Sequence, residues 1–61
     1  MANLSSKELG ALEDQLSQEV MLIKKYRAYS NLCTDPTLKT VCDQVADKHQ
    51  KHFDTLMTHL S

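Results

Sequence analysis

Three side chains in this sequence have the types and spacing to hold a metal ion: Glu19, His49 and His52. The two histidines are three residues apart, so in a helix their imidazoles lie on one face. Imidazole and carboxylate groups are common ligands of zinc, iron and copper. Three such ligands leave one coordination position for water, as catalytic zinc sites do. The sequence therefore offers a candidate metal site, provided that the fold brings the three residues together.

The first element that must position these residues is a long helix, expected over about residues 6–33. Ser5 and Glu8 have the spacing of a capping box, in which each side chain satisfies a free backbone N–H of the other residue. Proline is absent from this stretch, and Gly10 costs roughly 1 kcal/mol relative to alanine, which a helix of this length can absorb.

The second element is a helix expected over about residues 36–60, separated from the first by a turn at residues 34–35. Asp35 is a strong N-cap, and Pro36 suits the first position of a helix. A connection this short makes the two helices antiparallel neighbours. The 61 residues are thus predicted to form one all-α domain, an antiparallel helical hairpin.

Apolar residues follow heptad spacing along both expected helices. The seam residues are Leu9, Leu12, Leu16, Glu19, Ile23, Tyr26, Ser30 and Cys33 in the first helix, and Leu38, Cys42, Val45, His49, His52, Leu56 and His59 in the second. Flanking apolar residues widen both faces beyond what one hairpin needs. The simplest supplier of further helices is a second copy, so we expect a homodimeric four-helix bundle.

Glu19, His49 and His52 interrupt these seams at one level. If the chain folds about residues 34 and 35, residue 19 lies opposite residue 50, beside both histidines. A buried carboxylate without a partner is costly, so Glu19 is expected to be paired. Two interpretations stay open: a metal site that takes zinc, iron or copper, or a structural polar layer whose hydrogen bonds fix the register of the helices.

Composition and charge exclude several classes of protein. The net charge of −1 and the lack of a basic stripe predict no binding to nucleic acid. No run of 18 apolar residues occurs, which predicts no membrane span, and the first residues lack the pattern of a signal peptide. A cytoplasmic location is therefore the expectation.

Cys33 and Cys42 lack the Cys-x-x-Cys spacing of zinc and redox motifs. We expect two reduced thiols packed as small apolar groups. Along the expected hairpin they are offset by about six residues, or roughly 9 Å at the rise of a helix, which exceeds the usual span of a disulfide.

Three short motifs together resemble the spore coat F family and its small ferritin-like relatives in spore-forming bacteria. They are Glu19 followed seven residues later by Tyr26, the turn Asp35-Pro36 followed by Leu38-Lys39, and His49-x-x-His52 followed by Phe53. The resemblance covers roughly residues 9–60. It implies a ferritin-like four-helix bundle made from two chains, a structural or assembly role, a spore-associated location and spore-coat proteins as partners.

Carried over by position, Glu19 matches the carboxylate of the first helix in ferritin-like sites, and His52 matches the histidine of their Glu-x-x-His motif. His49 stands where that motif has glutamate. Di-iron sites are rich in bridging carboxylates, so this histidine-rich set suits zinc or copper better. The Gly-Trp-Tyr ending of the family is also absent.

The first interpretation is therefore a small self-associating protein with a structural or assembly role. The alternative is a metal-binding protein using Glu19, His49 and His52, with or without redox or hydrolytic activity, and no catalytic residue is predicted. A third class, an adaptor for another protein, would need an apolar groove that stays exposed after dimerisation.

Overall fold

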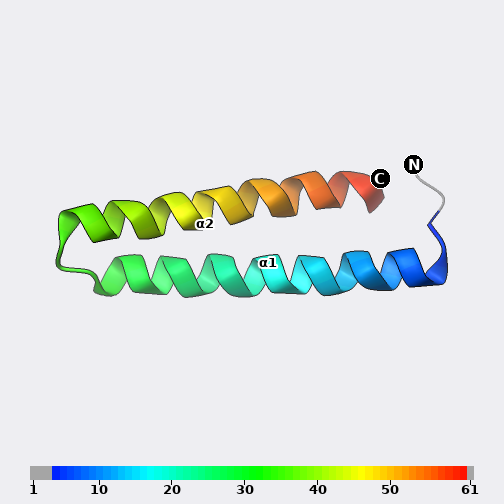
Figure 1. Ribbon diagram of the computed structural model, residues 1–61, viewed down its shortest axis with the longest axis horizontal. Helices are drawn as coiled ribbons and strands as arrows, with labels where there is room; N and C mark the ends of the chain where they lie inside the picture. Colours follow the sequence, from blue (N-terminus) through cyan, green and yellow to red (C-terminus); the bar gives the residue numbers. More distant parts are fainter. Residues whose placement is uncertain (1–3, 61) are drawn as a thin grey trace.

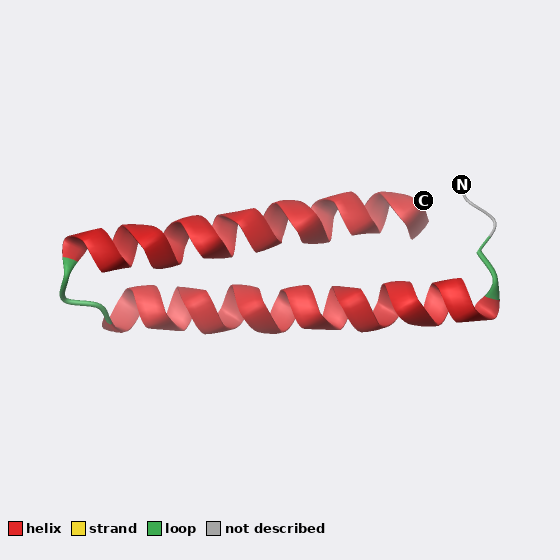
Figure 2. Ribbon diagram, viewed as in Figure 1, coloured by secondary structure: helices red, strands yellow, loops and turns green. Residues whose placement is uncertain are grey.

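The computed structural model describes residues 4–60, which form two antiparallel helices lying side by side (Figures 1 and 2). Helix α1 spans Ser6–Leu32 and helix α2 spans Pro36–Met57, followed by a single 3-10 turn, η1, at Thr58–Leu60. No strand occurs in this part of the chain. The molecule is an elongated rod of 46 × 15 × 11 Å. The predicted helical hairpin is confirmed.

The beginning of α1 is fixed by the expected capping box. The Ser5 hydroxyl accepts a hydrogen bond from the Glu8 amide, and the Ser5 amide donates to the Glu8 carboxylate, both at 3.1 Å. These two bonds satisfy backbone donors that have no partner within the helix. Hydrogen bonding to Ser5 lowers the pKa of the Glu8 carboxyl. The beginning of the first helix could therefore be located from local sequence alone.

The turn between the helices is held by Asp35. Its carboxylate accepts from the amides of Thr37 at 2.8 Å and Leu38 at 3.0 Å, and Pro36 opens α2 as expected. Helix α1 ends at Leu32, one residue earlier than expected, because Cys33 already has extended backbone angles. The expected end of the second helix is tightened into η1, as helix termini commonly are.

Few side chains are fully enclosed between the two helices. Within residues 4–60 the buried ones are Glu19, Ser30, Cys42 and Ala46. Ala46, expected only at the flank of the seam, is completely buried, whereas the expected seam residues Leu38 and His59 are exposed. Each of two packed helices buries only one narrow stripe of side chains. On α2 this stripe includes Ala46, and residues on either side of the stripe remain at least partly exposed.

Cys33 and Cys42 border the same apolar cavity, which their expected offset along the hairpin did not indicate. Both thiols are free, and both line one apolar cavity beside the turn. The 9 Å offset assumed helical rise on both sides of the turn, but Cys33 lies outside α1 in extended backbone.

Candidate metal centre

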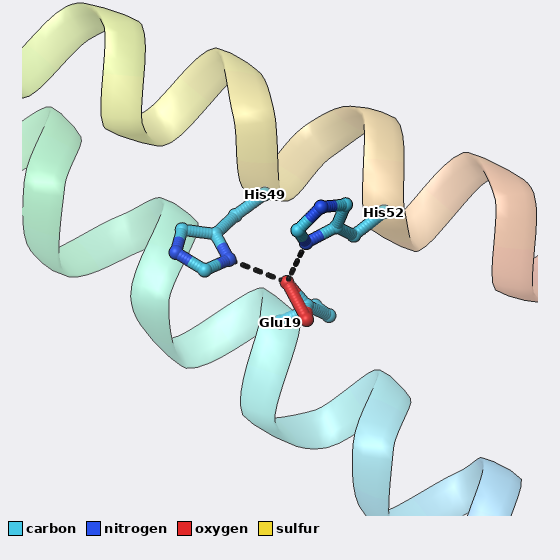
Figure 3. Close-up of side chains that lie close together, drawn as sticks. All are labelled: Glu19, His49 and His52. Atoms are coloured by element: carbon cyan, nitrogen blue, oxygen red, sulfur yellow. Dashed lines mark hydrogen bonds and ion pairs between the residues drawn. The ribbon is translucent and has the colours of Figure 1, made fainter.

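Glu19, His49 and His52 converge between the two helices, where Glu19 is buried, His49 is half-buried and His52 is exposed (Figure 3). Glu19 projects from the middle of α1 and is 3% exposed, while both histidines project from α2. The antiparallel arrangement sets residue 19 level with residues 49 and 52, as the fold about residues 34 and 35 predicted. Ligand atoms of all three side chains lie within 4.8 Å of one another.

Both imidazoles are directed at the same carboxylate oxygen. Nδ1 of His49 lies 2.6 Å from Oε1 of Glu19, and Nδ1 of His52 lies 3.5 Å from that atom (Figure 3). The rings of His49 and His52 stand edge to face, with centroids 5.5 Å apart and an interplanar angle of 87°. The first distance is a short hydrogen bond, whereas the second is longer than a usual hydrogen bond and is an ion-pair contact when His52 is protonated.

Gln15 holds the other oxygen of the same carboxylate. Its Nε2 donates to Oε2 of Glu19 at 3.0 Å, so both carboxylate oxygens are engaged. Sequence reasoning missed Gln15, although its position four residues before Glu19 places the two side chains on one helical face. A partner of this kind fixes the orientation of a carboxylate ligand and helps to tune a metal site.

Comparison with known proteins gives one informative match. An uncharacterized protein of Bacillus subtilis (strain 168), YuzM, is 32% identical to the chain over 57 residues, which cover 93% of the chain and 70% of that protein. The chain belongs to the YuzM family. No family model and no solved structure matches it. The name of the relative assigns no activity, so the chemistry of this YuzM-family chain must be argued from its side chains.

Electrostatics keep Glu19 ionised. The hydrogen bond from His49 lowers the pKa of the Glu19 carboxyl, and it outweighs burial, which acts in the opposite direction. Gln15 and the charges of the two histidines lower the pKa further. Because an ionised carboxylate only accepts hydrogen bonds, Nδ1 of His49 carries the proton in the 2.6 Å contact.

The three ligand atoms are close enough that they could hold a cation, with hydrogen bonds exchanged for coordination. A metal between the three groups would displace the proton on Nδ1 of His49 and draw on the carboxylate that is already ionised. A cleft of about 280 Å³, lined by Gln15, Glu19, His52, Thr55 and Leu56, lies beside the cluster. It provides room for a water molecule or a small ligand at the remaining coordination position.

The third histidine stands apart from the cluster. His59 lies in η1 and is exposed. Over residues 4–60, Glu19, His49 and His52 form the group of His, Cys, Asp or Glu residues with three ligand atoms in reach of one ion. The structure thus brings the three predicted residues together.

Proposed function

We propose that the chain is a self-associating helical protein, in which two hairpins pack into a homodimeric four-helix bundle with a structural or assembly role. One observation carries the proposal: the apolar residues buried in the described part of one chain are only Cys42 and Ala46. Large apolar side chains are instead exposed on the rod; they are Leu9, Met21, Tyr29, Leu32, Leu38, Val41, Met57 and Leu60.

The energetics favour a second copy as the partner. A chain of this length is marginally stable alone and usually needs a metal, disulfides or association. Covering a large apolar side chain contributes roughly 1.5–3 kcal/mol when burial goes from fully exposed to complete. An identical rod matches the 46 Å length of the hairpin, and a net charge of −1 sets up little repulsion between copies.

A role in the spore coat rests on the motifs that resemble the spore coat F family. Two hairpins supply the four helices that a ferritin-like bundle requires. In this proposal the dimer is a packing unit, and spore-coat proteins are its further partners.

Sedimentation equilibrium and circular dichroism over a dilution series test self-association. We expect a species of twice the chain mass, and we expect helicity and mass to fall together on dilution, because folding and association are linked. A fully helical monomer that stays folded at low concentration would rule the proposal out.

A second candidate function is metal binding, and the convergence of three ligand atoms within 4.8 Å favours it. We propose that Glu19, His49 and His52 bind zinc, iron or copper. One carboxylate and two imidazoles suit zinc or copper better than a di-iron centre. A dimer would hold two such sets, one from each chain.

Thermal melting with and without zinc tests the metal site. At neutral pH we expect zinc to raise the melting temperature of the wild type, and the gain to shrink as pH approaches 6, since ligation requires neutral imidazole. His52→Ala should abolish the gain, and the matched variant His59→Ala should keep it. The absence of any shift in the wild type, with zinc, iron or copper, would end the metal hypothesis.

A further inference from the structure

The turn end of the hairpin holds two thiols in one apolar cavity. The cavity measures about 390 Å³ and is lined by Tyr26, Tyr29, Leu32, Cys33, Leu38 and Cys42. Cys42, in α2, is 6% exposed, whereas Cys33, which caps the end of α1, is more accessible. Nine positions separate them in sequence, and both line the cavity beside the turn.

We propose that Cys33 and Cys42 are a reversible dithiol pair that closes to an intramolecular disulfide on exposure to a peroxide. Bridged cysteines need Cα atoms within about 7 Å, and their side chains must face one another. Both side chains border one cavity, and, after burial, a side-chain hydrogen bond with Cys33 is among the causes that raise the pKa of the Cys42 thiol. Cys33 lies beyond the last residue of α1, so its backbone can adjust without breaking the interior of a helix.

The steps balance with hydrogen peroxide as the oxidant. The Cys33 thiolate attacks one peroxide oxygen, the O–O bond breaks, and Cys33 becomes a sulfenic acid while hydroxide leaves. The sulfur of Cys42 then attacks the sulfenic sulfur and displaces its oxygen as water. In sum, two thiols and one peroxide give one disulfide and two waters. A dithiol reductant returns both thiols by exchange.

The two cysteines have different roles in this chemistry. Burial in the cavity, and then the neighbouring Cys33 thiol, raise the pKa of the Cys42 thiol. A thiol held in its protonated form reacts slowly with peroxide, so the more accessible Cys33 is attacked first and Cys42 resolves it.

A disulfide explains the pair better than a bound metal does. Structural zinc sites need four ligands, and the three-ligand group among residues 4–60 is the separate cluster of Glu19, His49 and His52. The thiols are surrounded by tyrosine and leucine side chains. The proposal does not rest on self-association, because both cysteines belong to one chain.

Intact-mass spectrometry after treatment with hydrogen peroxide, in the presence of a chelator, tests the pair. We expect the folded chain to lose the mass of two hydrogen atoms, and we expect dithiothreitol to reverse the loss. Proteolysis should yield one peptide pair linked through Cys33 and Cys42. The closed ring spans only residues 33–42, yet it should raise the melting temperature by roughly 10 °C, through loss of chain entropy in the unfolded state.

Two variants distinguish the roles of the thiols. Cys42→Ser should form a sulfenic acid, trapped as a dimedone adduct, at nearly the wild-type rate. Cys33→Ser should react slower by roughly tenfold or more, since its remaining thiol is buried. The proposal is overturned if the wild type gains only oxygen atoms, links two chains instead of closing within one, or remains unmodified while the urea-unfolded chain reacts.

Discussion

The middle of the hairpin and its turn end differ in which side chains they bury and how those side chains are surrounded. In the middle, a buried carboxylate is surrounded by partners: His49, His52 and Gln15 all reach Glu19. Across residues 4–60 no buried polar side-chain atom lacks a hydrogen-bond partner. At the turn end the cavity is apolar, and Leu32 and Leu38, on its wall, are 79% and 53% exposed.

The difference shows what two helices can and cannot do alone. The polar groups of one layer need only hydrogen-bond partners on the two facing helices, so a single hairpin can supply all of them. A large apolar side chain needs surroundings on several sides, which two helices do not provide. In the proposed dimer, the middle would therefore set the register within one chain, and the turn end would supply apolar surface for the contact between chains.

The largest effect is expected from placing a charge at the turn end. Leu38→Glu puts a carboxylate in the third position of α2, in the first turn, where the helix dipole stabilises negative charge. The variant should remain helical, while the free-energy cost of desolvating the new charge weakens association of the two chains. We expect the dimer dissociation constant to rise by roughly 100-fold, equivalent to about 2.7 kcal/mol, in sedimentation equilibrium.

Thr37→Glu is the matched control for that change. It adds the same charge one residue earlier, at an exposed polar position. The variant should dimerise as the wild type does. Equal weakening in both variants would mean that charge near the turn, and not the apolar wall, governs association.

The second effect comes from the middle layer. Glu19→Ala removes the acceptor of the hydrogen bonds from Gln15 and His49 and leaves space behind it, so we expect a loss of about 2 kcal/mol in the free energy of unfolding. Glu19→Leu fills the space, and the partly exposed histidines can turn to water, so its loss should be smaller. Urea titration at fixed protein concentration measures both. A larger loss of stability for Glu19→Leu than for Glu19→Ala would show that the hydrogen bonds of the carboxylate matter more than the space it fills.

Local signals made the hairpin and the level of the polar layer predictable. A capping box, an Asp-Pro turn and the absence of internal proline define the two helices without tertiary information. Counting from the turn then sets residue 19 opposite the two histidines. The contact of Gln15 with Glu19 was missed although their four-residue spacing indicates it. The shared cavity of the two thiols escaped prediction because it depends on the extended backbone of Cys33, which spacing does not encode.

The phase of the inner stripe on α2 also escaped prediction. Heptad spacing allows either Val45 or Ala46 to face the first helix between Cys42 and His49. Only the packing of α1 against α2 shows that Ala46 is the buried residue. A small side chain there lets the helices come close. The register along the axis was therefore readable from the sequence, while the rotation of α2 about its axis was not.

The third effect is a loss of folding stability at acid pH that arises from Glu19, in the middle of the hairpin. The folded-state pKa of Glu19 lies below its ordinary value of 4.5, so the unfolded chain binds its proton first as pH falls. The stabilising contribution is complete above about pH 4.5 and is lost as pH falls through the folded pKa. Urea midpoints of Glu19→Gln should therefore converge on those of the wild type in acid.

Glu8→Gln controls for the capping carboxylate, whose pKa is also lowered, by Ser5. Glu8 is exposed, so its removal should flatten the acid response less than removal of Glu19. If the Glu8 variant loses more of the response, the cap and not the middle layer controls stability in acid.

The smallest effect concerns the polar contact of the turn end. Nζ of Lys39 donates to the carbonyl and hydroxyl oxygens of Ser30, at 3.0 and 3.1 Å, and Ser30 is 2% exposed. Lys39→Met keeps the aliphatic length and removes the donor. The carbonyl also accepts from the Cys33 amide, so the expected loss is only about 0.5–1 kcal/mol.

Asp47→Asn provides the comparison for Lys39→Met, because it also removes one charge that joins the two helices. Its 2.9 Å contact with Arg27 is exposed on both sides, so it should cost less than about 0.5 kcal/mol. Lys39→Arg retains donors and should restore part of the stability lost in Lys39→Met. If Asp47→Asn instead costs more than Lys39→Met in parallel urea titrations, surface charge and not the buried serine contact stabilises this half of the hairpin. The exposed contact between Arg27 and Asp47 would then count as a third stabilising region, between the polar middle and the apolar turn end.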